Sequence, residues 1–320
     1  MKRKIIDHLA SKQGDYISGE DIAEVLSMTR ANVWKYIKEL RKHGFDIESA
    51  TNKGYRLNRV AKSLNEDSLY YYFRDNSFVR ESCFFEEIDS TNNYLKSRTN
   101  ELPDKTLVVA KKQIKGRGRR TKEFESAPGG LYFSLLIQNG MDMSEVSFVT
   151  SIVAVAVHKA LKEFGVETKI KWPNDIILKG RKLCGILTEM VSDMELNHRL
   201  IIGIGLNLKN RFSEELSKIA VSLEEEGYEV EAIPLLQKVI EYLEYFYEKL
   251  LRGERDEALC ILRTESYLIG KKIGFEYNHE RKEGMVEDVE DDGSLRVLTL
   301  DREVIRLGSG EVSILNIGQN

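Results

Sequence analysis

Residues 18–44 read SGEDIAEVLSMTRANVWKYIKELRKHG and decide the fold of the N-terminal part of the chain. Ser18 is a favoured N-cap residue, so a short helix is predicted to begin there. Its apolar stripe is expected to be Ile22, Val25 and Leu26. A second helix, over residues 30–44, follows a short break at 27–29, and its apolar residues recur at spacings of four and three: Val33, Ile37 and Leu40. The pattern predicts two helices joined by a tight turn.

The flanking segments extend this unit. Residues 2–12 place three apolar side chains on one helix face, and residues 45–48 and 55–57 flank Asn52-Lys53-Gly54, which suits a hairpin turn. Two helices, a tight turn and a hairpin together predict a winged helix-turn-helix.

The face of the second helix opposite its apolar stripe carries side chains that suit base edges and phosphates: Thr29, Arg30, Asn32, Lys35 and Lys38. Residues 1–62 hold 13 Lys and Arg against 8 Asp and Glu, whereas the remainder of the chain has more acidic than basic residues. A basic head on an acidic body favours operator DNA as a partner. The alternative is a small helical packing module with a solvated basic face.

Composition narrows the class of protein. Hydrophobic residues make up 42% and charged residues 31% of the 320-residue chain, as expected for a globular protein of two or three domains. No apolar run reaches the ~20 residues that span a bilayer, and the first residues lack the apolar segment of a secretory signal, so no membrane association is expected. Three widely spaced cysteines, Cys83, Cys184 and Cys260, indicate a reducing cytoplasm rather than a disulfide framework.

Residues 63–269 mix strands and helices, which predicts an α+β domain of catalytic size. The expected strands are 106–110, 131–137, 166–171, 176–178, 184–191 and 199–206, and the expected helices are 144–163, 234–251 and 254–267. From residue 270 the pattern changes to short alternating strands broken by glycines, including 272–277, 281–289 and 295–300, which fits a small β-barrel.

Residues 111–122 read KKQIKGRGRRTK, and seven of these twelve are Lys or Arg. Like charges at this density repel one another unless an anion lies among them. The guanidinium groups of Arg117 and Arg119 suit either a nucleic-acid backbone or the phosphates of a nucleotide. A solvated basic loop is the alternative. No P-loop or complete dinucleotide fingerprint is present, so a bound nucleotide would use another scheme.

Other candidate positions are ambiguous on spacing alone. Asn174 and Asp175 follow Trp172-Pro173 at the end of a predicted strand, where they offer ligands to a hydrated metal or to a neighbouring loop. Lys182 is expected in a turn, where a lysine is ordinarily solvated. Gly203 and Gly205 permit close approach of a ligand, but strand glycines more often mark a bulge or tight packing. Ser90 is expected to cap a short helix.

Five motifs occur together in a fixed order. They are Ser90-Thr91-Asn92, Gln113-x-x-Gly116-Arg117-Gly118-Arg119-Arg120, Lys171-Trp172-Pro173-Asn174-Asp175, Arg181-Lys182-Leu183-x-Gly185-Ile186-Leu187 and Gly203-Ile204-Gly205-Leu206-Asn207. On these motifs the chain resembles, over essentially its whole length, the bifunctional biotin–protein ligases that also repress biotin synthesis. The resemblance implies an α+β multidomain protein with a winged helix-turn-helix at 1–62, a mixed α/β biotin-ligase catalytic domain at 63–269 and an SH3-like β-barrel at 270–320.

The resemblance also implies site residues. Lys182 takes the place of the family's catalytic lysine, with Arg117 and Arg119 as the other charge-neutralising groups. Biotin would meet the following residues: Ser90, Thr91, Asn92, Gln113, Gly116, Arg117, Gly118, Arg119, Lys182, Gly185, Gly203 and Gly205. The adenylate or ATP would meet Phe124, Lys171, Trp172, Asn174, Asn207, Phe212 and Ile219. Asp175 is the candidate ligand for Mg²⁺. For Phe212 and Ile219 the alternative is one face of an ordinary amphipathic helix.

The chain departs from the family's usual G-R-G-R-x-G-R-x-W loop at three positions. Thr121 replaces glycine and stiffens the loop, and Lys122 replaces arginine. Phe124 replaces tryptophan, which keeps an aromatic face near adenine but removes the indole N–H.

Two half-reactions are implied by the resemblance. Biotin and MgATP give biotinyl-5′-adenylate and pyrophosphate, and a lysine of the acceptor domain of a biotin-dependent carboxylase then takes the biotin. The adenylate would also act as a corepressor by promoting a homodimer that binds operator DNA. Two alternatives are a biotin-sensing repressor without catalysis and a related acyl-protein ligase that uses lipoate.

Overall fold

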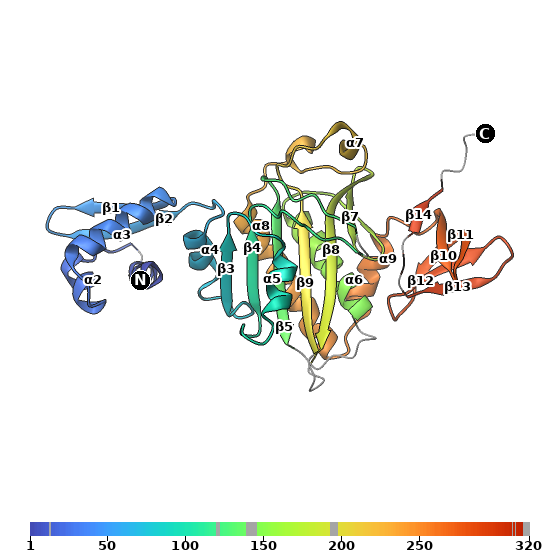
Figure 1. Cartoon of the computed structure of the whole chain (residues 1–320), viewed down its shortest axis with the longest axis horizontal. Coiled ribbons are helices and arrows are strands. Elements are labelled where there is room, and N and C mark those ends of the chain that lie inside the picture. Colours follow the sequence, from blue (N-terminus) through green and yellow to red (C-terminus); the bar gives the residue numbers. More distant parts are fainter. Residues whose placement is uncertain are drawn as a thin grey trace.

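The computed structural model describes the whole chain except residues 13, 120, 121, 139–145, 193–197, 309, 311 and 316–320. The molecule is elongated, with an N-terminal head, a central unit built on one large sheet and a small C-terminal β unit in a row (Figure 1). Within the described part, no helix is long and apolar enough to cross a membrane.

The head contains the predicted winged helix-turn-helix elements. They are α1 (Lys2–Ser11), α2 (Gly19–Val25), α3 (Arg30–Lys42), β1 (Phe45–Ala50) and β2 (Gly54–Val60). The Ser18 side chain caps α2 by accepting from the backbone N–H groups of Glu20 and Asp21, and Thr29 caps α3 in the same way. The predicted stripe of α3 is fully buried at Val33, Ile37 and Leu40. The predicted cap at Ser18 and the predicted stripe of α3 are therefore confirmed.

The prediction that Val25 belongs to the core of the head is wrong. Val25 is 62% exposed, whereas Ile22 is fully buried and Ala23 is nearly so. Since successive residues of a helix are about 100° apart, the buried arc of α2 lies on the side of positions 22, 23 and 26 and leaves Val25 on the opposite flank.

The wing needs glycine at its turn. Gly54 has φ +100°, and a Cβ placed there would lie 2.0 Å from the carbonyl oxygen of Ile17. Ile17 pairs with Tyr55 through two backbone hydrogen bonds of 2.8 Å, so the wing is tied to the segment that precedes α2.

Helix α4 (Glu66–Phe73), which the sequence patterns did not predict, joins the head to the central unit. Its Leu69 and Phe73 belong to the central core, while Tyr70, Tyr71 and Tyr72 pack against the core of the head. Asp67 is buried on α4 and pairs with two groups of the head, Lys2 Nζ at 3.1 Å and His43 Nδ1 at 2.5 Å. Head and central unit therefore share α4.

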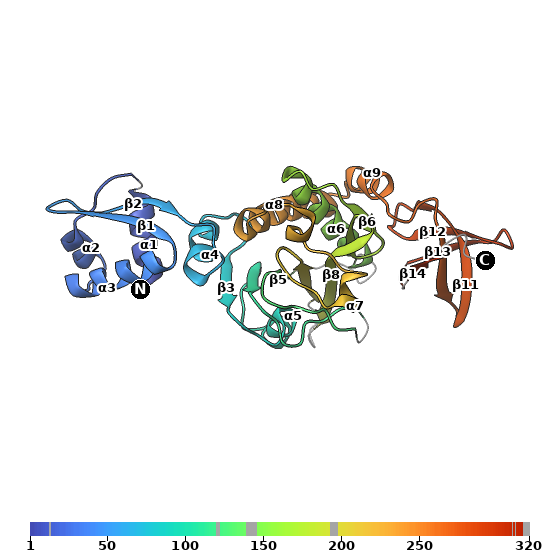
Figure 2. The same ribbon diagram turned by 90° about the horizontal axis from the view of Figure 1, so that it is seen from above.

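The central sheet has seven strands in the order β3-β4-β5-β9-β8-β7-β6. The strands are β3 (Glu81–Phe85), β4 (Thr106–Ala110), β5 (Leu131–Gln138), β6 (Lys169–Lys171), β7 (Asp175–Leu178), β8 (Arg181–Ser192) and β9 (His198–Leu206). Only the β3–β4 pair is parallel. Two long helices, α6 (Val146–Glu163) and α8 (Ala232–Leu251), cover one face, and the short α5 (Thr91–Ser97) lies on the other (Figures 1 and 2).

The predicted boundaries of the central unit need several corrections. β3 was not predicted, and β6 begins at Lys169 rather than at 166 because only three residues pair with β7. β8 begins at Arg181, since the turn before it lies at Lys179 and Gly180, which both have positive φ. Lys182 is therefore a strand residue and not a turn residue. α9 (Asp256–Thr264) is shorter at both ends than the predicted helix.

The C-terminal unit is an antiparallel sheet of five strands in the order β13-β12-β11-β10-β14. They are β10 (Lys272–Tyr277), β11 (Glu280–Val289), β12 (Leu295–Thr299), β13 (Val304–Leu307) and β14 (Val312–Ile314), of which the last two were not predicted. Its apolar side chains join the central core, and the Trp172 indole N–H donates to the carbonyl of Gly293 at 2.9 Å. The C-terminal sheet is thereby docked beside the segment that connects β6 and β7.

Candidate functional site

Two adjoining cavities lie on the α5 face of the central sheet. The first is lined by Ser90, Thr91, Asn92, Gln113, Arg117, Gly118, Arg119, Phe124, Asn174, Lys182, Gly185, Ile186, Leu187, Gly203, Ile204 and Gly205. The second is lined by Gly118, Arg119, Lys122, Glu123, Phe124, Lys171, Trp172, Pro173, Asn174, Asp175, Lys182, Gly310 and Val312. The shared residues include Lys182, Arg119 and Phe124, so one ligand can extend through both cavities.

Glycines form the floor of the first cavity. Gly185 of β8 lies opposite Gly205 of β9, and the β8–β9 register has no bulge there. A Cβ at Gly203 would lie 2.1 Å from Asn92 Oδ1, and one at Gly205 would lie 2.6 Å from the Phe124 ring. The strand glycines therefore mark close approach of side chains to the sheet, not a bulge.

A buried polar cluster closes one end of this cavity. The Ser90 side chain caps α5 by accepting from the N–H of Asn93. The backbone N–H and the hydroxyl of Thr91 donate to Gln113 Oε1 at 2.8 and 3.1 Å, and Gln113 Nε2 donates to the Ser126 hydroxyl at 2.9 Å. Ser126 is a member of the cluster that sequence reasoning missed. Fixed donors and acceptors in a dry pocket are what a polar, uncharged ligand group requires.

Asn92 faces the floor but is held by the protein. It is nearly fully buried, and its Nδ2 donates to Glu189 Oε2 at 3.0 Å. Its Oδ1 lies 2.6 Å from the Ser134 hydroxyl. Both polar atoms of the amide are thus used inside the site, so Asn92 shapes the cavity wall.

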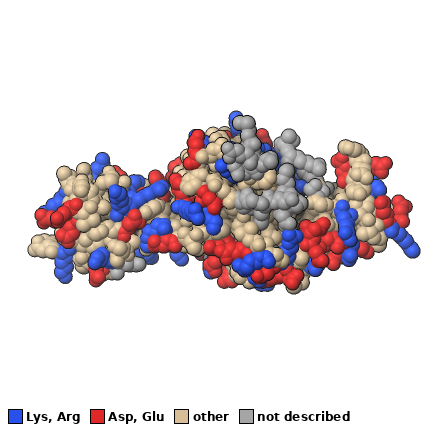
Figure 3. All heavy atoms as spheres, turned by 90° about the horizontal axis from the view of Figure 1, so that it is seen from below, with Lys and Arg blue, Asp and Glu red and all other residues tan. Residues whose placement is uncertain are grey.

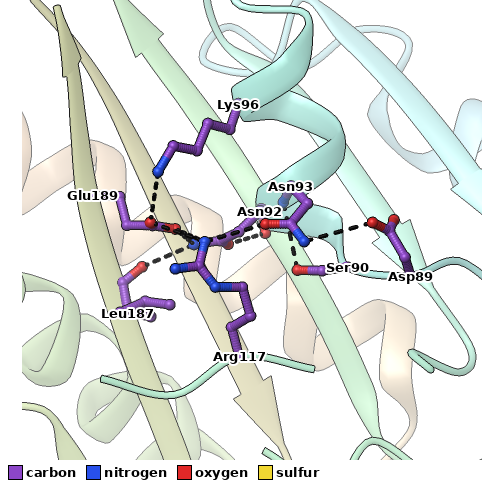
Figure 4. A network of polar contacts seen from close by, with 9 residues as sticks. Asp89, Ser90, Asn92, Asn93, Lys96, Arg117, Leu187 and Glu189 are labelled. Carbon is purple, nitrogen blue, oxygen red and sulfur yellow. Dashed lines mark hydrogen bonds and ion pairs between the residues drawn. The ribbon is translucent and has the colours of Figure 1, made fainter. Parts of the chain in front are cut away.

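Glu189 of β8 was not predicted as a site residue. Its carboxylate lies 3.1 Å from Arg117 Nη1 and 3.3 Å from Lys96 Nζ (Figure 4). Burial raises the pKa of Glu189, but the hydrogen bond from Asn92 and the charges of Arg117 and Lys96 outweigh it, so the pKa lies below its ordinary value. No sequence signal marked Glu189, because its partners come from other segments.

Lys182 lies where the two cavities meet. Its Nζ is 2.7 Å from Asp175 Oδ1 and 5.7 Å from the centroid of the Phe124 ring. The side chain is about one-third exposed, at 34%. Its backbone N–H donates to Ile219 at 2.8 Å, which ties this end of β8 to the loop after α7 (Glu214–Ser217). The ammonium group is thus fixed at a junction that two ligand groups can share.

The second cavity combines the central unit with the C-terminal unit. Arg119 Nη1 donates to the carbonyl of Gly310 at 3.0 Å and lies 3.5 Å from Asn174 Oδ1. Asn174 Nδ2 donates in turn to the carbonyl of Ile186 at 2.9 Å. Lys171 and Lys122 add positive charge to the wall, so this cavity suits an anionic ligand.

Asp175 is the predicted metal ligand, and here it pairs with Lys182. Among the described residues no three His, Cys, Asp or Glu side chains gather as a metal site. One carboxylate fits Mg²⁺ only where other oxygens complete the shell, as phosphate oxygens and water do.

Four predicted site residues line neither cavity: Gly116, Asn207, Phe212 and Ile219. Gly116 makes a close turn, since a Cβ there would lie 2.2 Å from the carbonyl oxygen of Phe124. Asn207 is buried and donates to the carbonyl of Val221 at 3.2 Å, while Ile219 is 66% exposed. Short α7 carries no buried residue, so neither Phe212 nor Ile219 forms an apolar lid over the two cavities here.

The basic loop finds carboxylate partners within the protein. Lys111 pairs with Glu86 at 2.9 Å, Lys112 pairs with Glu87 at 2.5 Å, and Arg117 pairs with Glu189. The expectation that only a bound anion offsets the charge of this loop is therefore too strong. Arg120 and Thr121 lie outside the described residues.

The candidate DNA face lies on the exposed side of α3. Arg30, Asn32, Lys35 and Lys38 are all exposed there, and Thr29 is the N-cap. Trp34 was not predicted, and it is 55% exposed with Lys38 Nζ 5.1 Å from its ring centroid. On the face seen from below, acidic and basic side chains are interspersed over those parts of the molecule that are not drawn in grey (Figure 3).

Three family models match separate parts of the chain. Residues 2–56 match an HTH domain, residues 84–207 match the biotin/lipoate A/B protein ligase family, and residues 268–315 match the biotin protein ligase C-terminal domain. The order of the three matches follows the head, the central sheet and the C-terminal sheet.

Curated relatives match nearly the whole chain. The bifunctional ligase/repressor BirA of Bacillus subtilis is 34% identical over 279 residues, which covers 84% of this chain and 85% of the relative. The protein of the same name from Escherichia coli is 29% identical and covers 97% of this chain and 96% of the relative. A solved structure, the Aquifex aeolicus biotin protein ligase in complex with biotin and ATP, matches with a TM-score of 0.66 and 26% identity, covering 74% of this chain and 99% of that one. The chain belongs to the biotin–protein ligase family and, within it, to the bifunctional ligase/repressor group.

Proposed function

We propose that the chain activates biotin with ATP at the two joined cavities, transfers it to a lysine of an acceptor protein, and represses transcription through the head. The observation that carries this proposal is the position of Lys182 between an uncharged polar pocket and a basic cavity. The similarity to the Aquifex aeolicus ligase, whose structure contains biotin and ATP, supports the same two ligands here.

Biotin fits the first cavity by its chemistry. Its bicyclic ring is thin enough to lie on the glycine floor once the Phe124 ring, which packs over Gly205, moves aside. Its ureido group needs both donors and acceptors. Ser90 lines the closed end of the cavity, and Thr91 and Gln113 supply these groups there by exchanging their hydrogen bonds to each other and to Ser126 for bonds to the ureido group. The valerate carboxylate then points toward Lys182.

ATP fits the second cavity. Lys171, Lys122 and Arg119 give it positive charge, and Phe124 offers an aromatic face at the junction. Mg²⁺ would be brought by the phosphates of ATP, with Asp175 as the protein ligand nearest to them, and would add charge neutralisation. Gly310 and Val312 place the C-terminal unit, which we propose to be an SH3-like barrel at residues 270–320, at the edge of this cavity.

The chemistry requires two anions to meet. A carboxylate oxygen of biotin attacks the α-phosphorus of ATP, the bond to the bridging oxygen breaks, and pyrophosphate leaves. Lys182 donates hydrogen bonds to both reactants because a compact ammonium group has three donors. Arg117 and Arg119 offset further charge as it develops, and holding the reactants in line supplies the remaining acceleration.

In the second step this chain orients the two reactants and supplies no further chemical group. The amine of the acceptor lysine attacks the acyl carbon of biotinyl-5′-adenylate, loses a proton, and forms an amide while AMP leaves. The acceptor is a biotin carboxyl carrier domain, as the name of the Paracoccus denitrificans relative, biotin–[acetyl-CoA-carboxylase] ligase, suggests.

Repression is assigned to residues 1–62 and ligation to residues 63–269. The exposed basic face of α3 enters a major groove, and the wing contacts the flanking backbone. A dimer would place two such heads on a two-part operator. The edge available for it is residues 187–192 of β8, which pair with β9 but, among the described residues, with no strand on the other side. The adenylate favours this dimer by binding it better than the monomer.

The test is direct. The purified chain is mixed with biotin and MgATP, and biotinyl-adenylate and pyrophosphate are measured before and after a biotin carboxyl carrier domain is added. The proposal predicts both products and then labelling of a single lysine. If biotin binds but neither product forms, the chain is a sensor-repressor without catalysis. If lipoate replaces biotin in competition, the chain is an acyl-protein ligase of the lipoate type.

A further inference from the structure

The Glu189 carboxylate binds two cationic groups and one amide group, which come from two separate segments of the chain. Its Oε1 lies 3.1 Å from Arg117 Nη1 and 3.3 Å from Lys96 Nζ, and its Oε2 accepts from Asn92 Nδ2 at 3.0 Å. Arg117 belongs to the basic loop, while Lys96 and Asn92 belong to α5. Figure 4 shows the two segments converging on this one carboxylate of β8.

The carboxylate is placed where such contacts are strong. The Glu189 side chain is only 15% exposed, so its interactions are less screened than those at the surface. It lies on the same face of β8 as Gly185 and Leu187, which line the first cavity, because side chains alternate along a strand. Glu189 is thus a neighbour of the biotin pocket, but it does not line the cavity.

The contact with Arg117 controls the position of the loop. The described residues 116–119 and 122–124 pair as the two arms of a small hairpin, in which Gly118 N donates to the carbonyl of Lys122 at 2.7 Å and Phe124 N donates to the carbonyl of Gly116 at 2.9 Å. These bonds shape the hairpin but do not attach it to the sheet. Arg117 attaches the first arm, since it reaches Glu189 of β8 and Asn93 of α5 at 3.1 Å. Arg119 and the Phe124 ring make other contacts, with Gly310 and over Gly205.

We propose that Glu189 is a positioning residue for ligand retention: by holding Arg117 it keeps the backbone of residues 116–118 across the opening of the first cavity. This inference rests on the proposed function, and it adds a residue that touches no ligand. Loss of the Glu189 charge loosens the hairpin, so ligand escapes faster. Lys96 binds the same carboxylate without belonging to the loop, which makes it the matched control.

The first test needs no activity. Trypsin cleaves after Lys and Arg, and the loop offers such sites at residues 115–122. In the ligand-free chain, Glu189→Gln is expected to raise the rate of cleavage within this loop several-fold, whereas Lys96→Gln leaves it within about twofold of the wild type. Equal rates in all three proteins overturn the proposal, because the loop would then not depend on Glu189.

The second test uses the reaction. Glu189→Gln is expected to speed release of biotinyl-adenylate and to raise KM for biotin about tenfold with kcat within about threefold, as coupled residues commonly show. Arg117→Gln raises KM for biotin to the same extent and, because it also removes a charge-neutralising group, lowers kcat further. In that background Glu189→Gln adds no further increase in KM. Additive effects contradict the proposal. Melting temperatures of the variants show whether Glu189→Gln has a folding defect. If it has one, comparing Arg117→Gln with the double variant still shows whether Glu189 acts through Arg117.

The assays distinguish a failure of the proposed function from a failure of the inference about Glu189. If wild-type protein makes no biotinyl-adenylate, the proposed function fails, and loop proteolysis still decides whether Glu189 anchors the loop. If wild-type protein is active and Glu189→Gln behaves like Lys96→Gln in both assays, only the inference about Glu189 fails.

Discussion

The head and the ligand site are built in opposite ways. The candidate DNA face consists of residues within one helix, α3, whose opposite side forms the core of the head. The ligand site takes its residues from α5, the basic loop, β6 to β9 and the C-terminal unit. A local face is visible in sequence periodicity, whereas an assembled site becomes visible only when the fold brings its segments together. The two regions should therefore fail separately when substituted.

The largest expected effect is at the junction of the cavities. Lys182→Ala removes the ammonium group between the two reactants, so biotinyl-adenylate formation should fall by about 10²–10³-fold. DNA binding measured without biotin and ATP should stay unchanged, because that measurement does not depend on the adenylate. Lys169→Ala is the matched control, since Lys169 lies on β6, pairs with Glu265 and lines neither cavity. Turnover close to that of the wild type would remove Lys182 from the reaction.

The second effect tests the glycine floor. Gly203→Ala places a methyl group 2.1 Å from Asn92 Oδ1, and Asn92 is buried and cannot move aside freely. We expect a loss of about 1–3 kcal/mol in the free energy of unfolding and at least tenfold weaker biotin binding, measured by denaturant titration and calorimetry. Gly308→Ala, where no atom lies within 4 Å, should change neither quantity. Unchanged biotin affinity in Gly203→Ala would contradict the placement of biotin on the floor.

The third effect belongs to the head. Lys35→Ala and Lys38→Ala should each weaken DNA binding and reduce the slope of log K against log salt by about 1, because each removes one phosphate contact. Biotin activation should not change. Point variants separate the regions more cleanly than deletion of residues 1–62, since deletion removes Lys2 and His43 and leaves buried Asp67 without them. Fluorescence anisotropy with an operator duplex measures the change, and an unaltered salt slope would move DNA binding away from α3.

The smallest effect concerns the core of the central unit. Burial lowers the pKa of His158 on α6, whose Nδ1 lies 2.9 Å from the Thr168 hydroxyl. Since the folded state then favours neutral histidine, its contribution to stability is present above the ordinary pKa of about 6.5 and is lost as pH falls below it. The melting temperature of the wild type should therefore fall more between pH 7 and 5.5 than that of His158→Gln. Parallel curves would show that His158 does not titrate on unfolding.

The contrast between a local face and an assembled site explains which features could be predicted from the sequence. The cap at Ser18 and the stripe of α3 are local, and the structure agrees with both. The cap at Thr29 is equally local but was not predicted. The cavity residues of the motifs are brought together as the resemblance implied, but the position of Lys182 in a strand was missed because the turn at Lys179 lies earlier. Glu189 and Ser126 could not be found, since their partners are 72 and 13 residues away in sequence and no local pattern connects them.

Some predicted site residues line neither cavity because they shape the backbone instead. Gly116 and Asn207 belong to the motifs, yet one forms a close turn and the other holds a loop through Val221. A motif includes residues that shape the backbone as well as residues that contact a ligand, and only the packing distinguishes them.

If Lys182 and the two joined cavities activate biotin, the enzyme must exchange labelled pyrophosphate into ATP only when biotin is bound. The measurement is this exchange, with and without biotin, in the wild type and in Lys182→Ala. We expect exchange only when biotin is present, its loss in Lys182→Ala, and no change in Lys169→Ala. Exchange that needs no biotin, or that persists at the wild-type rate in Lys182→Ala, would contradict this assignment.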